Sequence, residues 1–178
     1  MKRIFILLFS LLTVTIAKSQ NYTWTNADLD DDFENPNNWT PTPLFGYPSF
    51  GETAIFDGTV SNGNCTMPND EDFTTLSMLA NYTGIVDASG VEVTLTNMSL
   101  QGGTFSSPAS TLHISGNLVK GAAGIFTTTA TSWLDYNLTS TTARSIVGAF
   151  PFRNLEITTT GNGNRILNFG AITATARN

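Results

Sequence analysis

Residues 97–105 read NMSLQGGTF, and residues 117–126 read NLVKGAAGIF. The two stretches match Asn to Asn, Gly to Gly and Phe to Phe at a spacing of 20 or 21 residues. A period near this length is typical of solenoids, in which each coil buries its apolar side only by stacking on its neighbours. This repeat predicts a right-handed β-solenoid.

Four short runs keep the same period. Alternation of apolar and polar residues in each run is typical of a strand with one buried side, and no window has the 3.6-residue period of an amphipathic helix. We therefore predict an all-β parallel β-helix with coils of about 20–22 residues. A two-sheet β-sandwich is the alternative, since it also contains many short strands. The runs start 19, 22 and 21 residues apart: Val93-Thr94-Leu95, Leu112-His113-Ile114, Leu134-Asp135-Tyr136 and Leu155-Glu156-Ile157.

Glycine residues separate these runs. A solenoid turns sharply between its strands, and glycine adopts positive φ without steric cost. We predict corners with positive φ at Gly102, Gly103, Gly121, Gly124, Gly161 and Gly163.

The chain divides into three parts. Residues 1–19 combine a positively charged start with an apolar run too short to span a bilayer, which is typical of a signal peptide. We expect the mature chain to begin at Gln20 and to be secreted or held at the cell surface. Residues 20–60 are expected to form an aromatic, Asp- and Pro-rich cap with the first strands, and residues 61–178 the coils. The final residues read as the middle of a repeat, which favours a chain that is part of a longer protein or assembly.

Composition limits the partners and the chemistry. The 14 acidic and eight basic residues give a net charge of −6, and without residues 1–19 the charge is near −9. Nucleic-acid binding needs clustered Lys and Arg, and so does attraction to anionic lipid, so neither partner is expected. Cys65 is the only cysteine, which excludes an internal disulfide. No phosphate-binding loop, zinc-protease motif or nucleophile elbow is present, so no cofactor is expected.

Large aromatic side chains crowd the start of the mature chain. We expect them to cover the open end of the coil stack, which otherwise exposes unpaired edges and apolar core. The residues of this cap are Trp24, Phe33, Trp39 and Phe45. The alternative is a carbohydrate-binding module, in which exposed rings stack on sugars. Its candidate residues are Trp24, Trp39, Trp133 and Tyr136.

The same segment carries an ordered pattern of motifs. Trp24-Thr25 is followed by Asn35-Pro36-Asn37-Asn38-Trp39, Pro48 and Gly51-Glu52-Thr53-Ala54-Ile55-Phe56-Asp57-Gly58. This order resembles the opening of repeat modules in large secreted bacterial adhesin-like surface proteins, which build β-solenoids. The resemblance implies an extracellular structural or adhesive module without catalysis, whose partner is a host surface, a matrix or a glycan.

Alternating carboxylates at Asp28, Asp30 and Asp32 are similar to a calcium-binding loop. The helix-loop-helix version of such a loop is excluded, because Phe33 stands where its turn glycine belongs. A looser calcium site and a solvated acidic loop are the two remaining interpretations.

The repeat period places Thr94, His113, Asp135 and Glu156 in the same slot of successive coils. Adjacent strands lie about 4.8 Å apart, so Asp135 and Glu156 are expected to be neighbouring carboxylates on one outer face. Two such groups beside a histidine suit a retaining glycosidase, which makes a glycan-active enzyme the second alternative. The other interpretation of these aligned residues is a polar, solvent-facing surface without catalytic activity.

Overall fold

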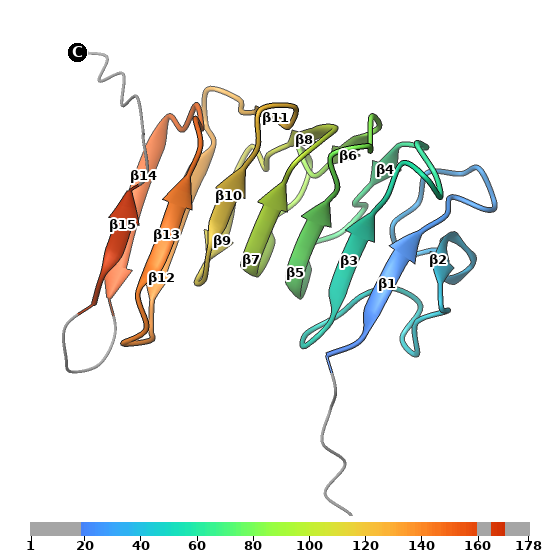
Figure 1. Ribbon diagram of the computed structural model, residues 1–178, viewed down its shortest axis with the longest axis horizontal. Coiled ribbons are helices and arrows are strands. Elements are labelled where there is room, and N and C mark those ends of the chain that lie inside the picture. Colours follow the sequence, from blue (N-terminus) through green and yellow to red (C-terminus); the bar gives the residue numbers. More distant parts are fainter. Residues whose placement is uncertain (1–18, 160–164, 170–178) are drawn as a thin grey trace, which may run out of the picture.

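The computed structural model describes residues 19–159 and 165–169, in which the regular structure is β-strand apart from one 3₁₀ turn, η1 (Pro36–Asn38). The strands lie side by side along the long axis of the molecule (Figure 1). They form a β-solenoid of about five turns. The predicted signal peptide lies outside the described residues except for Ser19.

The three central coils contribute a strand segment to each of three faces, and the other coils contribute to one or two of them. The first face contains the front halves of β5 (Glu71–Met78) and β7 (Val93–Leu100), then β9 (Thr111–Ile114), β12 (Trp133–Leu138) and β14 (Asn154–Thr159). The second face contains β1 (Asn21–Trp24), β3 (Thr53–Phe56), the back halves of β5 and β7, β10 (Leu118–Lys120), β13 (Arg144–Val147) and β15 (Leu167–Phe169). The third face contains β4 (Cys65–Thr66), β6 (Ile85–Asp87), β8 (Thr104–Ser106) and β11 (Ile125–Thr127).

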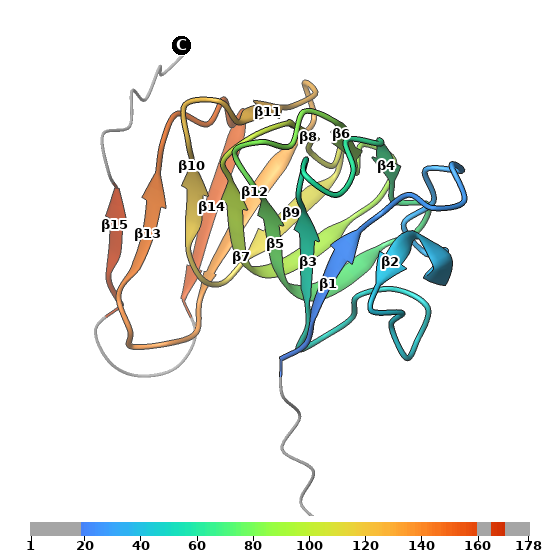
Figure 2. The same cartoon turned by 45° about the vertical axis from the view of Figure 1, so that its right-hand side comes forward.

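Neighbouring strands on all three faces are parallel, and each strand pairs with the equivalent strand of the next coil. The exception is β2 (Trp39–Thr40), which pairs antiparallel with β1 at the N-terminal edge. This pairing confirms the predicted solenoid, and the β-sandwich alternative is wrong. Figure 2 shows the faces enclosing the core.

The predicted repeat register is confirmed on the first face. Thr94 pairs with His113, His113 with Asp135, and Asp135 with Glu156. The residues on either side of this slot point inward because side chains alternate along a strand. They stack into columns that are at most 1% exposed: Val93, Leu112 and Leu134 in one, and Leu95, Ile114 and Tyr136 in the other.

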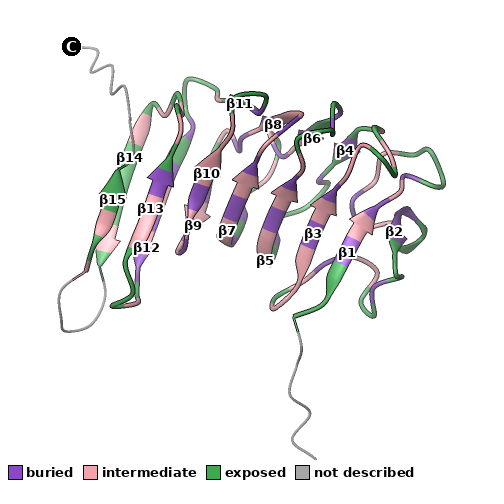
Figure 3. Cartoon of the chain, in the orientation of Figure 1, coloured by how far each residue is buried: buried purple, intermediate pink, exposed green. Residues whose placement is uncertain are grey.

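Burial ends at the last described coil. Leu155 and Ile157 on β14 continue the two inward columns, yet they are 42% and 44% exposed. No described strand lies beyond β14, so nothing in the described chain covers them. Figure 3 shows this change from the buried central strands to the exposed terminal ones.

Aromatic side chains pack at the opposite end of the stack. The rings of Trp24 and Trp39 lie 5.0 Å apart, and Phe33 lies 5.1 Å from Trp39. All three side chains are at most 2% exposed, and the Trp39 indole N–H donates to the Phe33 carbonyl over 2.8 Å. The expectation for Phe45 is wrong, because this side chain is 71% exposed. Phe56 packs against Trp24 in its place, at 5.8 Å.

The corner glycines serve close packing more than unusual backbone angles. Of the four predicted positions that the structure describes, Gly103 alone has a positive φ, of 65°. The prediction is wrong for Gly102, Gly121 and Gly124, which lie instead where neighbouring coils approach closely: a Cβ at Gly102 would stand 2.5 Å from the Leu79 carbonyl oxygen. Two further predicted positions, Gly161 and Gly163, lie outside the described residues.

The matched asparagines of the repeat link one coil to the next. Asn97 Oδ1 accepts a hydrogen bond from the backbone N–H of Asn117 over 2.9 Å, and Asn117 Oδ1 accepts one from Ser145 over 3.0 Å. Asn117 directly precedes β10 and Ser145 lies at the start of β13, so each side chain satisfies a backbone donor at the beginning of a strand in the following coil.

Gly102→Ala is expected to destabilise the protein by about 1–3 kcal/mol, because the added methyl group meets backbone oxygens of the preceding coil. Gly90→Ala is the matched control, since no described atom lies within 4 Å of a Cβ added there, and its expected effect stays within about 1 kcal/mol. Urea unfolding measures the free energy of unfolding of both variants. Equal effects of the two substitutions would show that the close approach of neighbouring coils at Gly102 does not limit stability.

Candidate functional site

The outward side chains of the first face bring carboxylate, imidazole, indole, amide and hydroxyl groups together on one surface. We call this surface the His113 face. It consists of Glu92, Thr94, Thr111, His113, Ser115, Trp133, Asp135, Asn137, Thr139 and Glu156. The alternation that buries the hydrophobic columns turns these residues outward, and the coil register brings together positions about 20 residues apart in the chain.

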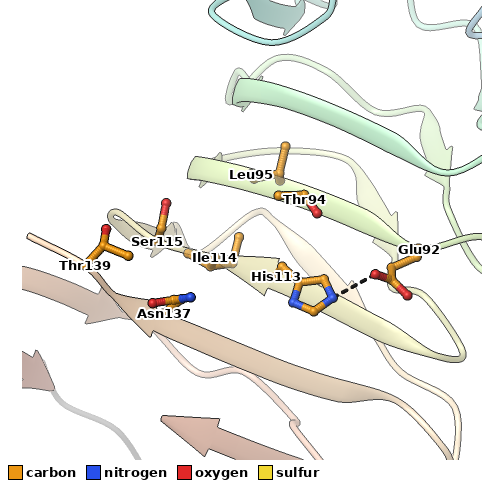
Figure 4. Close-up of a pocket in the computed structure, with 8 residues that line it drawn as sticks. All are labelled: Glu92, Thr94, Leu95, His113, Ile114, Ser115, Asn137 and Thr139. Atoms are coloured by element: carbon orange, nitrogen blue, oxygen red, sulfur yellow. Dashed lines mark hydrogen bonds and ion pairs between the residues drawn. The ribbon is translucent and has the colours of Figure 1, made fainter. Parts of the chain in front are cut away.

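His113 lies between two carboxylates. Its Nε2 is 2.9 Å from Glu92 Oε1, and its Nδ1 is 2.9 Å from Asp135 Oδ2 (Figure 4 draws the Glu92 contact). Only an imidazolium has two N–H donors, so both contacts are hydrogen bonds to carboxylates when the ring carries both protons. Glu92 is a partner that the sequence did not reveal, because it precedes the aligned slot by two residues and reaches His113 diagonally.

The two aligned carboxylates differ in their surroundings. Asp135 is engaged at both oxygens, since Oδ1 also accepts from the Thr158 hydroxyl over 3.3 Å. Glu156, directly opposite on β14, has no hydrogen-bond partner among the described residues. The register therefore brings the predicted pair onto adjacent strands, but only Glu156 has free oxygens.

Two adjoining open pockets lie on the His113 face and share His113. The first has a volume of about 430 Å³ and the second about 270 Å³. The first pocket is lined by Glu92, Thr94, Leu95, His113, Ile114, Ser115, Asn137 and Thr139, as Figure 4 shows. The second is lined by Thr111, His113, Trp133, Asp135 and Glu156.

The four candidate sugar-stacking aromatics do not share a surface. Trp24, Trp39 and Tyr136 are 0%, 2% and 0% exposed, so the prediction of an aromatic platform that includes them is wrong. The two tryptophans belong to the aromatic end of the core, and Tyr136 occupies an inward slot of β12. Trp133 is 46% exposed and lines the second pocket.

The carboxylates of the acidic loop accept hydrogen bonds from the asparagines that follow them. The Asn35 amide donates to Asp28 and Asp30, and the Asn38 amide donates to Asp30 over 2.6 Å. These bonds lower the pKa of Asp30. Within residues 19–159 and 165–169, no group of three or more acidic, His or Cys side chains is arranged to hold a metal ion. Calcium binding through Asp28, Asp30 and Asp32 stays a prediction.

Glu71, within the acidic run Asp70-Glu71-Asp72, is a buried acid. Its side chain is 4% exposed and lies in the inward column that continues with Val93. Its Oε1 has no hydrogen-bond partner among the described residues. Burial, followed by the negative charges of Glu34, Asp32 and Asp70, raises the pKa of Glu71 to about 8. The alternation with Phe73, two residues later, was the signal that this side chain points inward.

Comparison of the chain with protein-family models, characterised proteins and solved structures finds no match. In the described part of the chain, no helix is long and apolar enough to span a membrane. The strand topology alone defines the class: the chain is a parallel β-solenoid protein whose first face carries a polar, open site.

Glu71→Gln is expected to flatten the dependence of stability on pH. The folded pKa of Glu71 is about 8 and its ordinary value is 4.5, so between these values the folded state holds a proton that the unfolded state releases. Wild-type stability therefore falls relative to the variant as pH rises through this window. Urea unfolding at several pH values measures the difference. Asp72→Asn, which alters an exposed acid on the same strand, is the control that keeps the wild-type slope.

Trp133→Phe is expected to remove most of the tryptophan fluorescence that the neutral quencher acrylamide quenches. Trp133 is 46% exposed, and the other two tryptophans are almost completely buried. Stern–Volmer titrations of the folded protein measure the accessible fraction, and Phe50→Ala, at an exposed ring away from tryptophan, serves as control. Unchanged quenching in Trp133→Phe would mean that Trp24 or Trp39 reaches solvent.

Proposed function

We propose that this chain is an extracellular, non-catalytic solenoid module that presents the His113 face to a partner on behalf of a secreted or surface-attached protein. The observation that carries the proposal is the unbroken column of outward polar side chains across successive coils: Asp72, Thr94, His113, Asp135 and Glu156. A parallel stack supplies a long, regular surface of this kind without a deep cavity.

The sequence supports an extracellular place for this module. Residues 1–19 have the features of a signal peptide, and the order of Trp, Asn-Pro-Asn-Asn-Trp and Gly-Glu-Thr motifs resembles adhesin-like surface proteins.

A carbohydrate-binding role is the second candidate, and Trp133 is the observation that favours it. An exposed indole beside hydrogen-bonding groups is the arrangement that sugar binding needs. A glycan-active enzyme has less support. A retaining glycosidase needs two carboxyl groups that flank the bond to be cleaved, whereas Asp135 contacts His113 and Thr158 and lies with Glu156 on an open outer face.

Export of the full chain tests the proposal. Expressed in a Gram-negative host, the protein is expected in the periplasm with its N-terminus at Gln20, which intact-mass measurement of the purified product detects. Leu8→Arg, which interrupts the apolar run, is expected to hold the chain in the cytosol with residues 1–19 attached. A wild-type product found uncleaved in the cytosol would overturn the extracellular assignment.

A further inference from the structure

We infer that the second pocket of the His113 face, built around Trp133, is a binding site for a glycan whose sugars carry no acid group. The inference rests on the proposed extracellular function and names the ligand class of that surface. It is carried by the position of one tryptophan, the chemistry of its neighbours and the sign of the local charge.

Trp133 is held rigidly in an exposed position. It is the first residue of β12 and pairs with Thr111 on one side and Asn154 on the other, so strands on both sides fix its backbone. Its backbone N–H donates to the Ser110 carbonyl over 2.9 Å. An indole that is 46% exposed on such a backbone offers a flat apolar surface with little loss of conformational freedom on binding.

The residues around Trp133 suit the hydroxyl groups of a sugar. Glu156 offers carboxylate oxygens that have no hydrogen-bond partner in the described chain, and the Thr111 hydroxyl lines the same pocket. Carboxylates accept hydrogen bonds from hydroxyl groups, while a threonine hydroxyl both donates and accepts. A sugar whose apolar face lies on Trp133 would therefore find polar partners at the edge of its ring.

The adjoining pocket provides room for more than one sugar. It begins at His113 on β9, which both pockets share, and continues to Asn137 and Thr139 at the end of β12, in the next coil. Trp133 and Asn137 are four residues apart on one strand, which corresponds to about 13 Å. The ligand is therefore an oligosaccharide segment, with Trp133 at one end of the site.

Local charge decides which sugars are accepted. Glu92, Asp135 and Glu156 line the two pockets, and His113 is the one side chain among the lining residues that can carry a positive charge. Among residues 19–159 and 165–169, no Lys or Arg lines either pocket, so the carboxylate of a uronic acid would meet net negative charge there. Neutral sugars and amino sugars avoid this repulsion.

A glycan array containing neutral, amino and uronic-acid oligosaccharides tests the ligand class, with the purified mature chain, residues 20–178, as probe. Binding is expected to neutral or amino members and not to oligouronates. The strongest oligosaccharide is then titrated calorimetrically. Trp133→Ala is expected to weaken it about tenfold or more. Phe50→Ala, an exposed ring in the N-terminal loop region, is the control that leaves affinity unchanged.

Glu156→Gln separates charge from hydrogen bonding. The amide keeps polar contacts with a neutral sugar and removes one negative charge, so the preference for neutral over uronic-acid oligosaccharides is expected to shrink. Absence of binding to every array member, binding confined to oligouronates, or full affinity in a folded Trp133→Ala variant would each overturn the site. The binding results do not depend on the export experiment. If the full chain stayed uncleaved in the cytosol while residues 20–178 still bound glycan, the proposed extracellular function would be rejected and the binding site would stand.

Discussion

Parallel, in-register pairing between successive coils is the interaction on which this structure depends. Each strand satisfies its backbone groups only with the coil before and the coil after, at a spacing of about 4.8 Å. Equivalent residues must therefore stack: Thr94 on His113, His113 on Asp135 and Asp135 on Glu156. The close corner at Gly102 and the coil-linking bond from Asn117 to Asn97 are further consequences of this spacing.

Stacking also determines what kind of site the protein can have. A solenoid coil closes around a narrow, filled core, so functional groups must lie on its outer faces. Residues about one coil apart in sequence become neighbours there, which brings His113 between Glu92 and Asp135 and places Trp133 beside Glu156. The result is an open surface suited to an extended ligand.

The two ends of the stack and one buried charge interrupt this regularity. At the N-terminal end, Trp24, Phe33 and Trp39 form a buried aromatic cluster. At the other end, Leu155 and Ile157 remain exposed on β14. Glu71 occupies a slot in which later coils carry Val93 and Leu112, and burial holds its side chain largely protonated at neutral pH.

The sequence by itself determined the period, the alternation and the alignment of the polar column, because these depend on local spacing that every coil repeats. It predicted Asp135 beside Glu156 for this reason. Trp133 and Tyr136 are three residues apart, so alternation puts them on opposite sides of the strand, a consequence that the prediction of a shared aromatic platform overlooked. Only the tertiary structure decided that Glu92 reaches His113 and that Asn35 folds back onto Asp28. Such contacts depend on how loops and diagonal neighbours lie in space, which no periodic pattern encodes.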